Sequence, residues 1–231
     1  MNASRWFGDA RIRLYAGAAL ISLSPVWVKL VSVSPTTSGF YRVLIGGGAL
    51  AIYLVLGGKR LSLSRRVWSI LGLAAVFFAL DLWFWHRSIQ YVGPGLSTLL
   101  ANFQVFFMML AGAFLLGQAP SRSQLVAVPI ALLGLTLIVG IDPDKLTTDY
   151  RWGVTFGLLT AVSYSGYLLT LRASRSGSTY RLPTREVAVI SLATAAILGV
   201  TAFLEGESLV LSNSSDVAWL FGYGILSHCL G

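Results

Sequence analysis

The chain has 231 residues, of which 55% are hydrophobic and only 11% are charged, and its mean hydropathy is +0.74. A soluble domain carries about 25% charged residues, so this composition excludes a water-exposed globule and indicates a protein of the lipid bilayer. The net charge of +8 does not indicate nucleic acid as a partner, because the basic residues are divided among short loops. One cysteine and two histidines exclude a disulfide framework and a clustered zinc site, and no cofactor is expected.

Eight apolar stretches are each close to the length of about 20 residues that a helix needs to span a bilayer. The connectors between them are short, so neighbouring helices should run antiparallel, and no room is left for a soluble domain. The sequence therefore predicts an all-α bundle of about seven to eight transmembrane helices. The predicted spans are residues 14–33, 39–56, 67–91, 95–116, 125–141, 152–171, 187–204 and 217 onward.

The charged residues divide between the two sides that antiparallel helices imply. The side of the N-terminal tail carries Arg5, Arg11, Arg13, Lys59, Arg60, Arg65, Arg66, Arg122, Arg172, Arg175, Arg181 and Arg185. The opposite side carries Lys145 and Arg151 together with the acidic residues Asp142, Asp144, Asp149, Glu205, Glu207 and Asp216. Because Lys and Arg in short loops stay on the cytoplasmic side of a membrane, the N-terminus is predicted to be cytoplasmic.

Four ionisable residues fall inside the predicted spans, where a charge costs at least about 2.5–3.5 kcal/mol and needs a reason. At about 1.5 Å per residue, Lys29 and Asp81 lie roughly 21–22 Å from the cytoplasmic side, and Arg42 lies about 25 Å from it. We therefore expect a polar layer that lines a water-accessible cavity, with Asp81 paired to Lys29 or Arg42. The alternative is that Lys29 and Arg42 extend to the outer interface and only Asp81 is embedded. His86, near the outer end of its helix, is expected at the interface, and the alternative is that it lines the cavity.

Neutral polar residues extend this candidate site. Asn102 and Gln104 interrupt an apolar run and suit either cavity lining or hydrogen bonds between helices. Tyr164 and Tyr167 belong to a polar stripe that should face protein or water. The candidate substrate-binding residues are therefore Lys29, Arg42, Asp81, Asn102, Gln104, Tyr164 and Tyr167.

Other features are predicted to be structural. Trp83 and Trp85 suit the aromatic belt of a membrane protein more than ligand stacking. The pair Gly153 and Gly157 predicts close helix packing, and the glycine triplet 46–48 predicts the same or a flexible point. His228 and Cys229 are adjacent and point to different helix faces, so they are interpreted as incidental. No catalytic set of residues is present, and the chain is predicted not to be an enzyme.

Several motifs occur in a specific order. Phe-Tyr-Arg at 40–42 opens the second span, and Lys29 lies late in the first. The region 84–140 continues with YVGPG at 91–95, LLGQ at 115–118, SRSQ at 121–124 and LLGLTLIVG at 132–140. In this order and spacing they resemble the EamA-type transporters of the drug/metabolite transporter superfamily. Gln118 departs from the Glu that is usual there, and Gln104 falls where a proline is common.

The resemblance implies ten helices in two inverted five-helix repeats. Residues 1–141 would form the first repeat, and residues 142–231 an incomplete second repeat with helices six, seven and part of eight. Gly72 and Gly222 both lie early in the third helix of their repeats, and on that register Gly231 falls opposite Asp81. The sequence is therefore expected to be a fragment that holds about 7.5 helices of the ten.

The resemblance further implies a secondary transporter in the bacterial cytoplasmic (inner) membrane that exports small metabolites or drug-like compounds by alternating access. Its partners would be a small-molecule substrate and the bilayer, with a coupling proton on Asp81 and a second copy of the chain as further candidates. The alternative is a non-transporting scaffold or assembly partner, particularly if the truncated form is the natural product.

Overall fold

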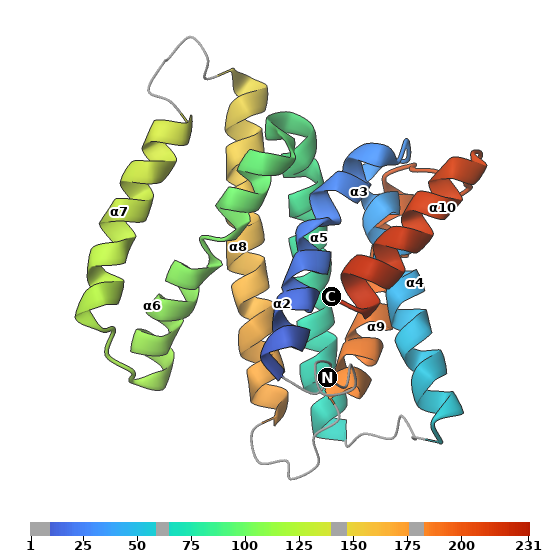
Figure 1. Cartoon of the computed structure of the whole chain (residues 1–231), viewed down its shortest axis with the longest axis horizontal. Helices are drawn as coiled ribbons and strands as arrows, with labels where there is room; N and C mark the ends of the chain where they lie inside the picture. Colours follow the sequence, from blue (N-terminus) through green and yellow to red (C-terminus); the bar gives the residue numbers. More distant parts are fainter. Residues whose placement is uncertain (1–9, 59–64, 140–146, 176–182) are drawn as a thin grey trace, which may run out of the picture.

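The computed structural model describes residues 10–58, 65–139, 147–175 and 183–231, and every regular element among them is a helix (Figure 1). The predicted all-α bundle is confirmed. Several calls lie outside the described residues: the predicted repeat boundary at 141/142 and the charged residues Arg5, Lys59, Arg60, Asp142, Asp144, Lys145 and Arg181. Among the described residues, four helical segments are long and apolar enough to cross a membrane, namely Pro35–Leu56, Arg65–Leu115, Thr148–Ser174 and Thr184–Leu204.

The first predicted span is divided into two helices, α2 (Ala10–Ser22) and α3 (Ser24–Leu30). Pro25 lies in the first turn of α3. Proline fits there because it has no N–H to donate and its ring would clash with a preceding helical turn. The chain therefore changes direction at Leu23, part-way through the span.

The next elements are α4 (Pro35–Leu56), α5 (Arg65–Ala101), α6 (Gln104–Leu116) and α7 (Arg122–Val139). Within α5 the chain turns at Gly93, whose φ of 80° is readily adopted only without a Cβ atom. This turn separates the predicted third and fourth spans. The fourth span is broken again between α5 and α6.

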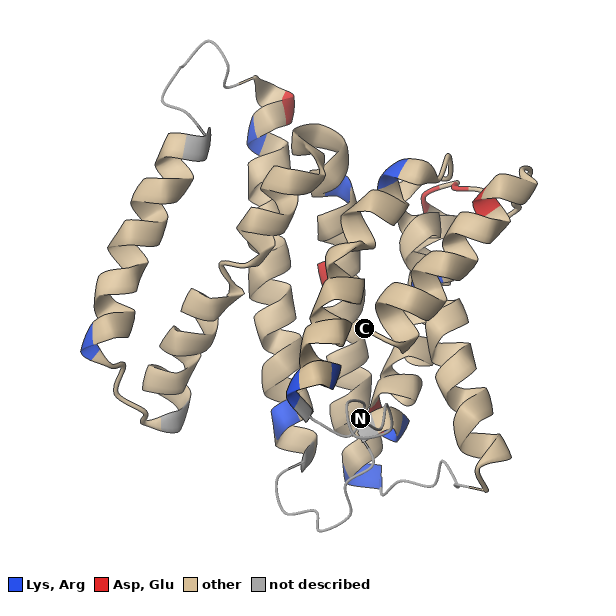
Figure 2. Ribbon diagram, in the orientation of Figure 1, with Lys and Arg blue, Asp and Glu red and all other residues tan. Residues whose placement is uncertain are grey.

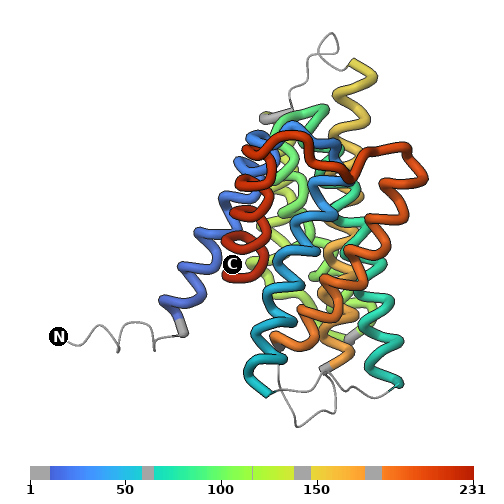
Figure 3. Tube along the Cα trace, turned by 90° about the vertical axis from the view of Figure 1, so that its right-hand side faces the viewer, coloured from blue at the N-terminus to red at the C-terminus, as the bar shows by residue number. Residues whose placement is uncertain are grey.

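The chain ends with α8 (Thr148–Arg175), α9 (Pro183–Leu204), α10 (Ser214–Gly222) and the π-helical segment η2 (Tyr223–Cys229). The most extensive packing joins α5 to α8 and α4 to α9. The segment η2 packs on α4, and α10 and η2 lie beside α2 and α3, as Figure 3 shows. Helix α7 stands at one edge of the bundle beside α6 (Figure 1).

Glycines permit the closest helix contacts. A Cβ atom on Gly47 would lie 2.6 Å from the Cβ of Ser191 in α9, and one on Gly157 would lie 2.6 Å from Cδ1 of Leu100. Real Cβ contacts are longer, so larger residues would push these helices apart. The predicted role in close packing is confirmed for Gly153 and Gly157 and for the first two glycines of the triplet 46–48, whereas Gly48 has no neighbour within 4 Å.

Large apolar side chains cover the outside of the bundle. Leu56, Phe114 and Phe203 are each 80–83% exposed. Monomeric soluble proteins rarely expose continuous apolar surface on this scale, whereas lipid tails solvate it. The surface therefore matches the apolar spans in indicating a multi-pass membrane protein.

Candidate functional site

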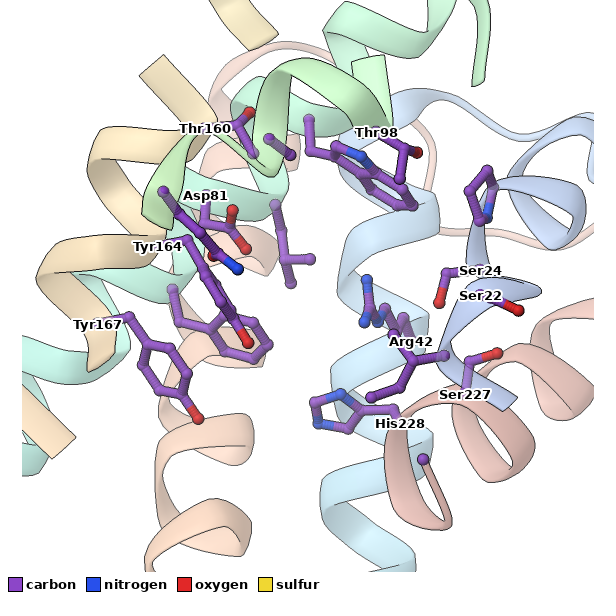
Figure 4. A pocket seen from close by; sticks show the side chains of 18 of the residues that line it. Ser22, Ser24, Arg42, Asp81, Thr98, Thr160, Tyr164, Tyr167, Ser227 and His228 are labelled. Atoms are coloured by element: carbon purple, nitrogen blue, oxygen red, sulfur yellow. The ribbon is translucent and has the colours of Figure 1, made fainter. Parts of the chain in front are cut away.

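A cavity of about 580 Å³ is lined by residues of α2, α3, α4, α5, α6, α8, α9 and η2 (Figure 4). Ligand pockets typically measure about 300–1,000 Å³. The walls include residues from both of the predicted repeats. Six of the seven candidate residues line this cavity: Arg42, Asp81, Asn102, Gln104, Tyr164 and Tyr167. Their role in substrate binding stays a prediction.

Lys29 lies elsewhere. It lines a second cavity of about 250 Å³, together with Ser38, His86 and Gln90, and its own side chain is exposed. The predicted ion pair with Asp81 is therefore wrong. The depth argument assumed one straight helix, whereas the break at Leu23 places Lys29 in the last turn of the separate helix α3.

Arg42 enters the cavity from α4. Its Nη1 donates a hydrogen bond to Tyr223 Oη at 3.1 Å, and its Cζ lies 5.0 Å from the centre of the Tyr223 ring and 5.8 Å from that of Trp85. No carboxylate of the described residues lies within 4.0 Å of it, and its Nε is buried without a hydrogen-bond partner. The guanidinium group is thus held by aromatic rings and a hydroxyl, without a countercharge.

Asp81 lies on the opposite side of the cavity from Arg42 (Figure 4). Its side chain is 7% exposed and makes no hydrogen bond or ion pair with a described residue. The predicted ion pair with Arg42 is also wrong, because the two side chains approach the cavity from opposite walls. An acidic and a basic side chain therefore face the same space without direct contact.

An aromatic stack lines the cavity on the side of Asp81. The Phe78 ring stacks on Tyr167 with 4.9 Å between ring centres and on His228 with 5.8 Å, and Tyr164 lies 5.5 Å from Tyr167. The His228 ring forms a hydrogen bond to Ser191 Oγ at 2.7 Å. The interpretation of His228 as incidental is wrong. Only the packing of η2 on α4 and α9 turns its ring toward the cavity, and residue spacing carries no signal of this.

Trp85 and His86 are more deeply buried than the sequence predicts. Trp85 is 7% exposed and lines the large cavity, so its assignment to the aromatic belt is wrong. His86 is 1% exposed, not interfacial: Nδ1 lies 2.7 Å from the Leu82 carbonyl oxygen, and Nε2 lies 3.4 Å from Tyr223 Oη. If Nδ1 donates to that carbonyl, Nε2 is left to accept from the Tyr223 hydroxyl, which itself accepts from Arg42.

Unpartnered polar atoms gather at the same cavity. Besides Arg42 Nε, the buried hydroxyls of Ser24 and Thr98 lack hydrogen-bond partners, and all three residues line it. Buried polar atoms are normally paired, so such exceptions call for an explanation. Ser24 follows the break between α2 and α3, and Thr98 precedes the break between α5 and α6. Interrupted helices near the middle of a membrane are typical of substrate sites in transporters.

A second polar group, which we call the Glu205 cluster, comprises Thr36, Trp83, Arg87, Glu205 and Glu207. It lies at the end of the bundle where α4 begins and α9 ends (Figure 1). Arg87 Nη2 donates to Glu205 Oε1 at 2.6 Å, and the Arg87 Cζ lies 3.8 Å from the centre of the Trp83 ring. Glu205 also accepts from Thr36 Oγ1 at 2.6 Å and from Trp83 Nε1 at 2.9 Å. The cluster joins α4, α5 and the segment after α9.

Hydrogen bonds determine the electrostatic properties of the carboxylates in and near the Glu205 cluster. Burial raises the pKa of Glu205, but hydrogen bonds from Thr36, Trp83 and Arg87 outweigh it and leave that pKa below the ordinary value. Glu207 accepts from the backbone N–H groups of the first turn of α4, where a carboxylate stabilises a helix. Nearby, hydrogen bonds from the Ser32 hydroxyl and N–H lower the pKa of Asp216.

The sequence pattern of the EamA-like transporter family matches residues 12–140, more than half of the chain. The chain belongs to this family. Among curated relatives, the uncharacterized inner membrane transporter YhbE of Escherichia coli (strain K12) is 27% identical over 226 residues, covering 93% of this chain and 69% of YhbE. The uncharacterized transporter YwfM of Bacillus subtilis (strain 168) is 26% identical over 163 residues, covering 69% of this chain and 53% of YwfM.

A solved crystal structure supports the fold. It superposes with a TM-score of 0.68 over 94% of this chain and 74% of that chain, at 22% sequence identity. Together with the apolar helices, membership of the EamA-like family establishes a multi-pass membrane transporter with a small-molecule substrate, and it points away from an enzyme. The predicted family and fold class are therefore confirmed.

Proposed function

We propose that this protein exports a small metabolite or drug-like compound from the cytoplasm as a secondary transporter that works by alternating access. The cavity of about 580 Å³ is its substrate site, lined by Arg42, Asp81, Asn102, Gln104, Tyr164 and Tyr167. In this proposal residues 1–141 form one repeat and residues 142–231 part of an inverted second repeat, and the site lies between them. The single observation that carries the proposal is this cavity, which contains Arg42 and Asp81 from the first proposed repeat and is also lined by residues of the second.

The distribution of charge supports a cytoplasmic N-terminus. Most Lys and Arg residues of the described part lie at the end of the bundle where α2 begins, and most Asp and Glu residues lie at the other end (Figure 2). The exceptions are Lys29 in the last turn of α3, Arg151 in the first turn of α8, Glu186 in the first turn of α9, and Arg87, which is paired with Glu205. The excess of basic residues matches the rule for cytoplasmic loops.

The Glu205 cluster supports alternating access. In the part of α5 before the turn at Gly93, the cavity lining ends at Trp85, and Arg87 of the cluster follows within the next turn. At the other end, the lining reaches Val187, which lies in the first turns of α9. In the proposed orientation the cluster therefore closes the outer side, while the cavity extends toward the cytoplasm. Transport requires the cluster to open in the opposite state.

Proton coupling is assigned to Asp81 in this proposal. It is the acidic residue of the cavity lining, and no described residue forms an ion pair with it. Such an acid can exchange a proton with the side to which the cavity is open. The predicted homodimer is a separate prediction that oligomer-mass measurement in detergent would test.

The test is an efflux screen. Cells that overexpress the gene and cells that carry the Asp81→Asn variant are compared for resistance to toxic metabolites and for metabolites released into the medium. We expect at least one compound to leave cells faster with the native protein, and its pH-dependent transport in vesicles to be lost with Asp81→Asn. Asp149→Asn, which changes an exposed acid outside the cavity, is the control. A complete absence of transport would contradict the proposed function, and unchanged pH dependence with Asp81→Asn would exclude the proton role.

A further inference from the structure

The cavity wall around Arg42 has the features of a binding site for an anionic group. We propose that the transported compound carries one carboxylate, which binds Arg42 and the hydroxyl of Ser24. Its apolar body lies against the aromatic side chains of the cavity, Phe78, Trp85 and Tyr164. This inference rests on the proposed transport function and names the chemical class of its substrate.

The first observation is an arginine without a countercharge. A guanidinium group inside the membrane normally pairs with an acid or faces water or a ligand. Arg42 contacts the ring and hydroxyl of Tyr223 and the ring of Trp85, and none of the acids that the structure describes lies within 4.0 Å. Aromatic faces attract a cation but do not neutralise it. A carboxylate would supply the missing charge and accept hydrogen bonds from the planar guanidinium.

The second observation is a pair of unused donors on one side of the cavity. Arg42 Nε and Ser24 Oγ are buried and lack partners, and Figure 4 shows both residues on the side opposite Asp81. Nearby serines differ: the Ser22 hydroxyl donates to Ala19 O, and that of Ser227 donates to Leu20 O. Arg42 and Ser24 thus keep free donors where these neighbouring serines do not, and a carboxylate has acceptor positions for both.

The remaining walls define the rest of the compound. Phe78, Trp85 and Tyr164 present aromatic surface to the cavity, which suits an apolar body. Asp81 on the far side would repel a second anionic group when ionised. The compound therefore carries its charge at the Arg42 end, and its other end is neutral or donates a hydrogen bond.

The test measures ligand binding to the purified protein from the rise in its Tm with ligand concentration. The probes are three matched pairs: benzoate and benzamide, 4-hydroxyphenylacetate and 4-hydroxyphenylacetamide, and hexanoate and hexanamide. Each amide has nearly the shape of its acid but no charge. We expect at least one carboxylate to bind saturably, at least about tenfold more tightly than its amide.

Substitutions test whether the preference for a carboxylate over its amide depends on Arg42 and Ser24. Arg42→Gln should weaken carboxylate binding about tenfold or more and leave amide binding unchanged, whereas Arg42→Lys should keep part of the preference. Ser24→Ala, a milder change that tests the same site if Arg42→Gln does not fold, should weaken carboxylate binding severalfold. Arg151→Gln, which removes an exposed arginine outside the cavity, should change neither.

The inference is overturned if no carboxylate binds, if the amides bind equally well, or if the folded Arg42 and Ser24 variants keep the full preference. These results differ from a failure of the proposed function. Efflux of only neutral or cationic compounds would leave transport standing and refute the anionic substrate. Carboxylate binding that depends on Arg42, combined with no efflux of any compound, would support the site and refute export.

Discussion

Replacing Glu205 with Gln should open the outer side of the cavity. The substitution keeps one side-chain oxygen, which can still accept from Trp83, but it replaces the oxygen that accepts from Thr36 with an amide group and removes the charge that binds Arg87 at 2.6 Å. A hydrogen bond between charged groups contributes about 1.5–3 kcal/mol, and a surface ion pair about 0–1 kcal/mol. The Arg87 and Glu205 side chains are 17% and 26% exposed, between these cases. We therefore expect the closed state to lose about 1–2 kcal/mol of stability, which shifts the equilibrium between closed and open states toward the open state by about 5–30-fold.

The assay uses Thr98→Cys, a position that lines the cavity, in a Cys229→Ser background. A membrane-impermeant maleimide added to the outer side of vesicles should label this cysteine about 5–30 times faster when Glu205 is Gln. Asp149→Asn, an exposed acid on the same side, is the matched control and should leave the rate unchanged. If Glu205→Gln leaves the labelling rate unchanged in a protein with unaltered Tm, the cluster does not close the cavity and the reasoning is refuted.

Three further predictions use the same contacts. The pKa of Glu205 in the folded protein lies below its ordinary value of 4.5. The stabilisation that ionised Glu205 gives to the closed state is therefore present above pH 4.5 and is lost as the pH falls through the lowered pKa. Closure measured by labelling should persist at about pH 5 and weaken only in stronger acid. Gly157→Ala should lower the Tm because its Cβ would meet Leu100, at a cost of about 1–3 kcal/mol, whereas Gly48→Ala, with no atom within 4 Å, should not. Glu207→Gln should speed hydrogen exchange of the Thr37 amide about fivefold, as expected for losing about 1 kcal/mol of helix capping.

The fold was largely predictable because the bilayer imposes a simple length rule on apolar segments. The turn between the third and fourth spans was recognisable from Gly93 and Pro94, and the close helix contacts from the glycine motifs. The breaks at Leu23 and after Ala101 were not predicted. Hydropathy averages over about a whole span, so a short interruption inside it leaves little trace. That averaging also misplaced Lys29.

The depth of the candidate residues in the membrane could be predicted from the sequence, but the direction in which their side chains point could not. Depth along a helix follows from counting residues, and it brought Arg42 and Asp81 to similar levels. Whether a side chain faces lipid, a neighbouring helix or a cavity depends on how the helices pack, and Trp85 and His86 were misplaced for this reason. Arg87 and Glu205 are separated by 118 residues in the sequence, so their ion pair was visible only in the structure.

In the proposed mechanism, substrate binding and closure of the outer side act on the same pair of helices. Arg42 lies six residues after Thr36 on α4, and Asp81 lies six residues before Arg87 on α5, which places each pair about 9 Å apart along its helix. A compound that reaches from Arg42 toward Asp81 therefore connects α4 to α5, which the Glu205 cluster also joins nearer the end of the bundle. Any movement of α4 relative to α5 that separates Thr36 from Arg87 also changes the spacing of Arg42 and Asp81. A substrate can favour the open state only if it binds better at the changed spacing, so the contacts that select the substrate are also those that couple its binding to opening.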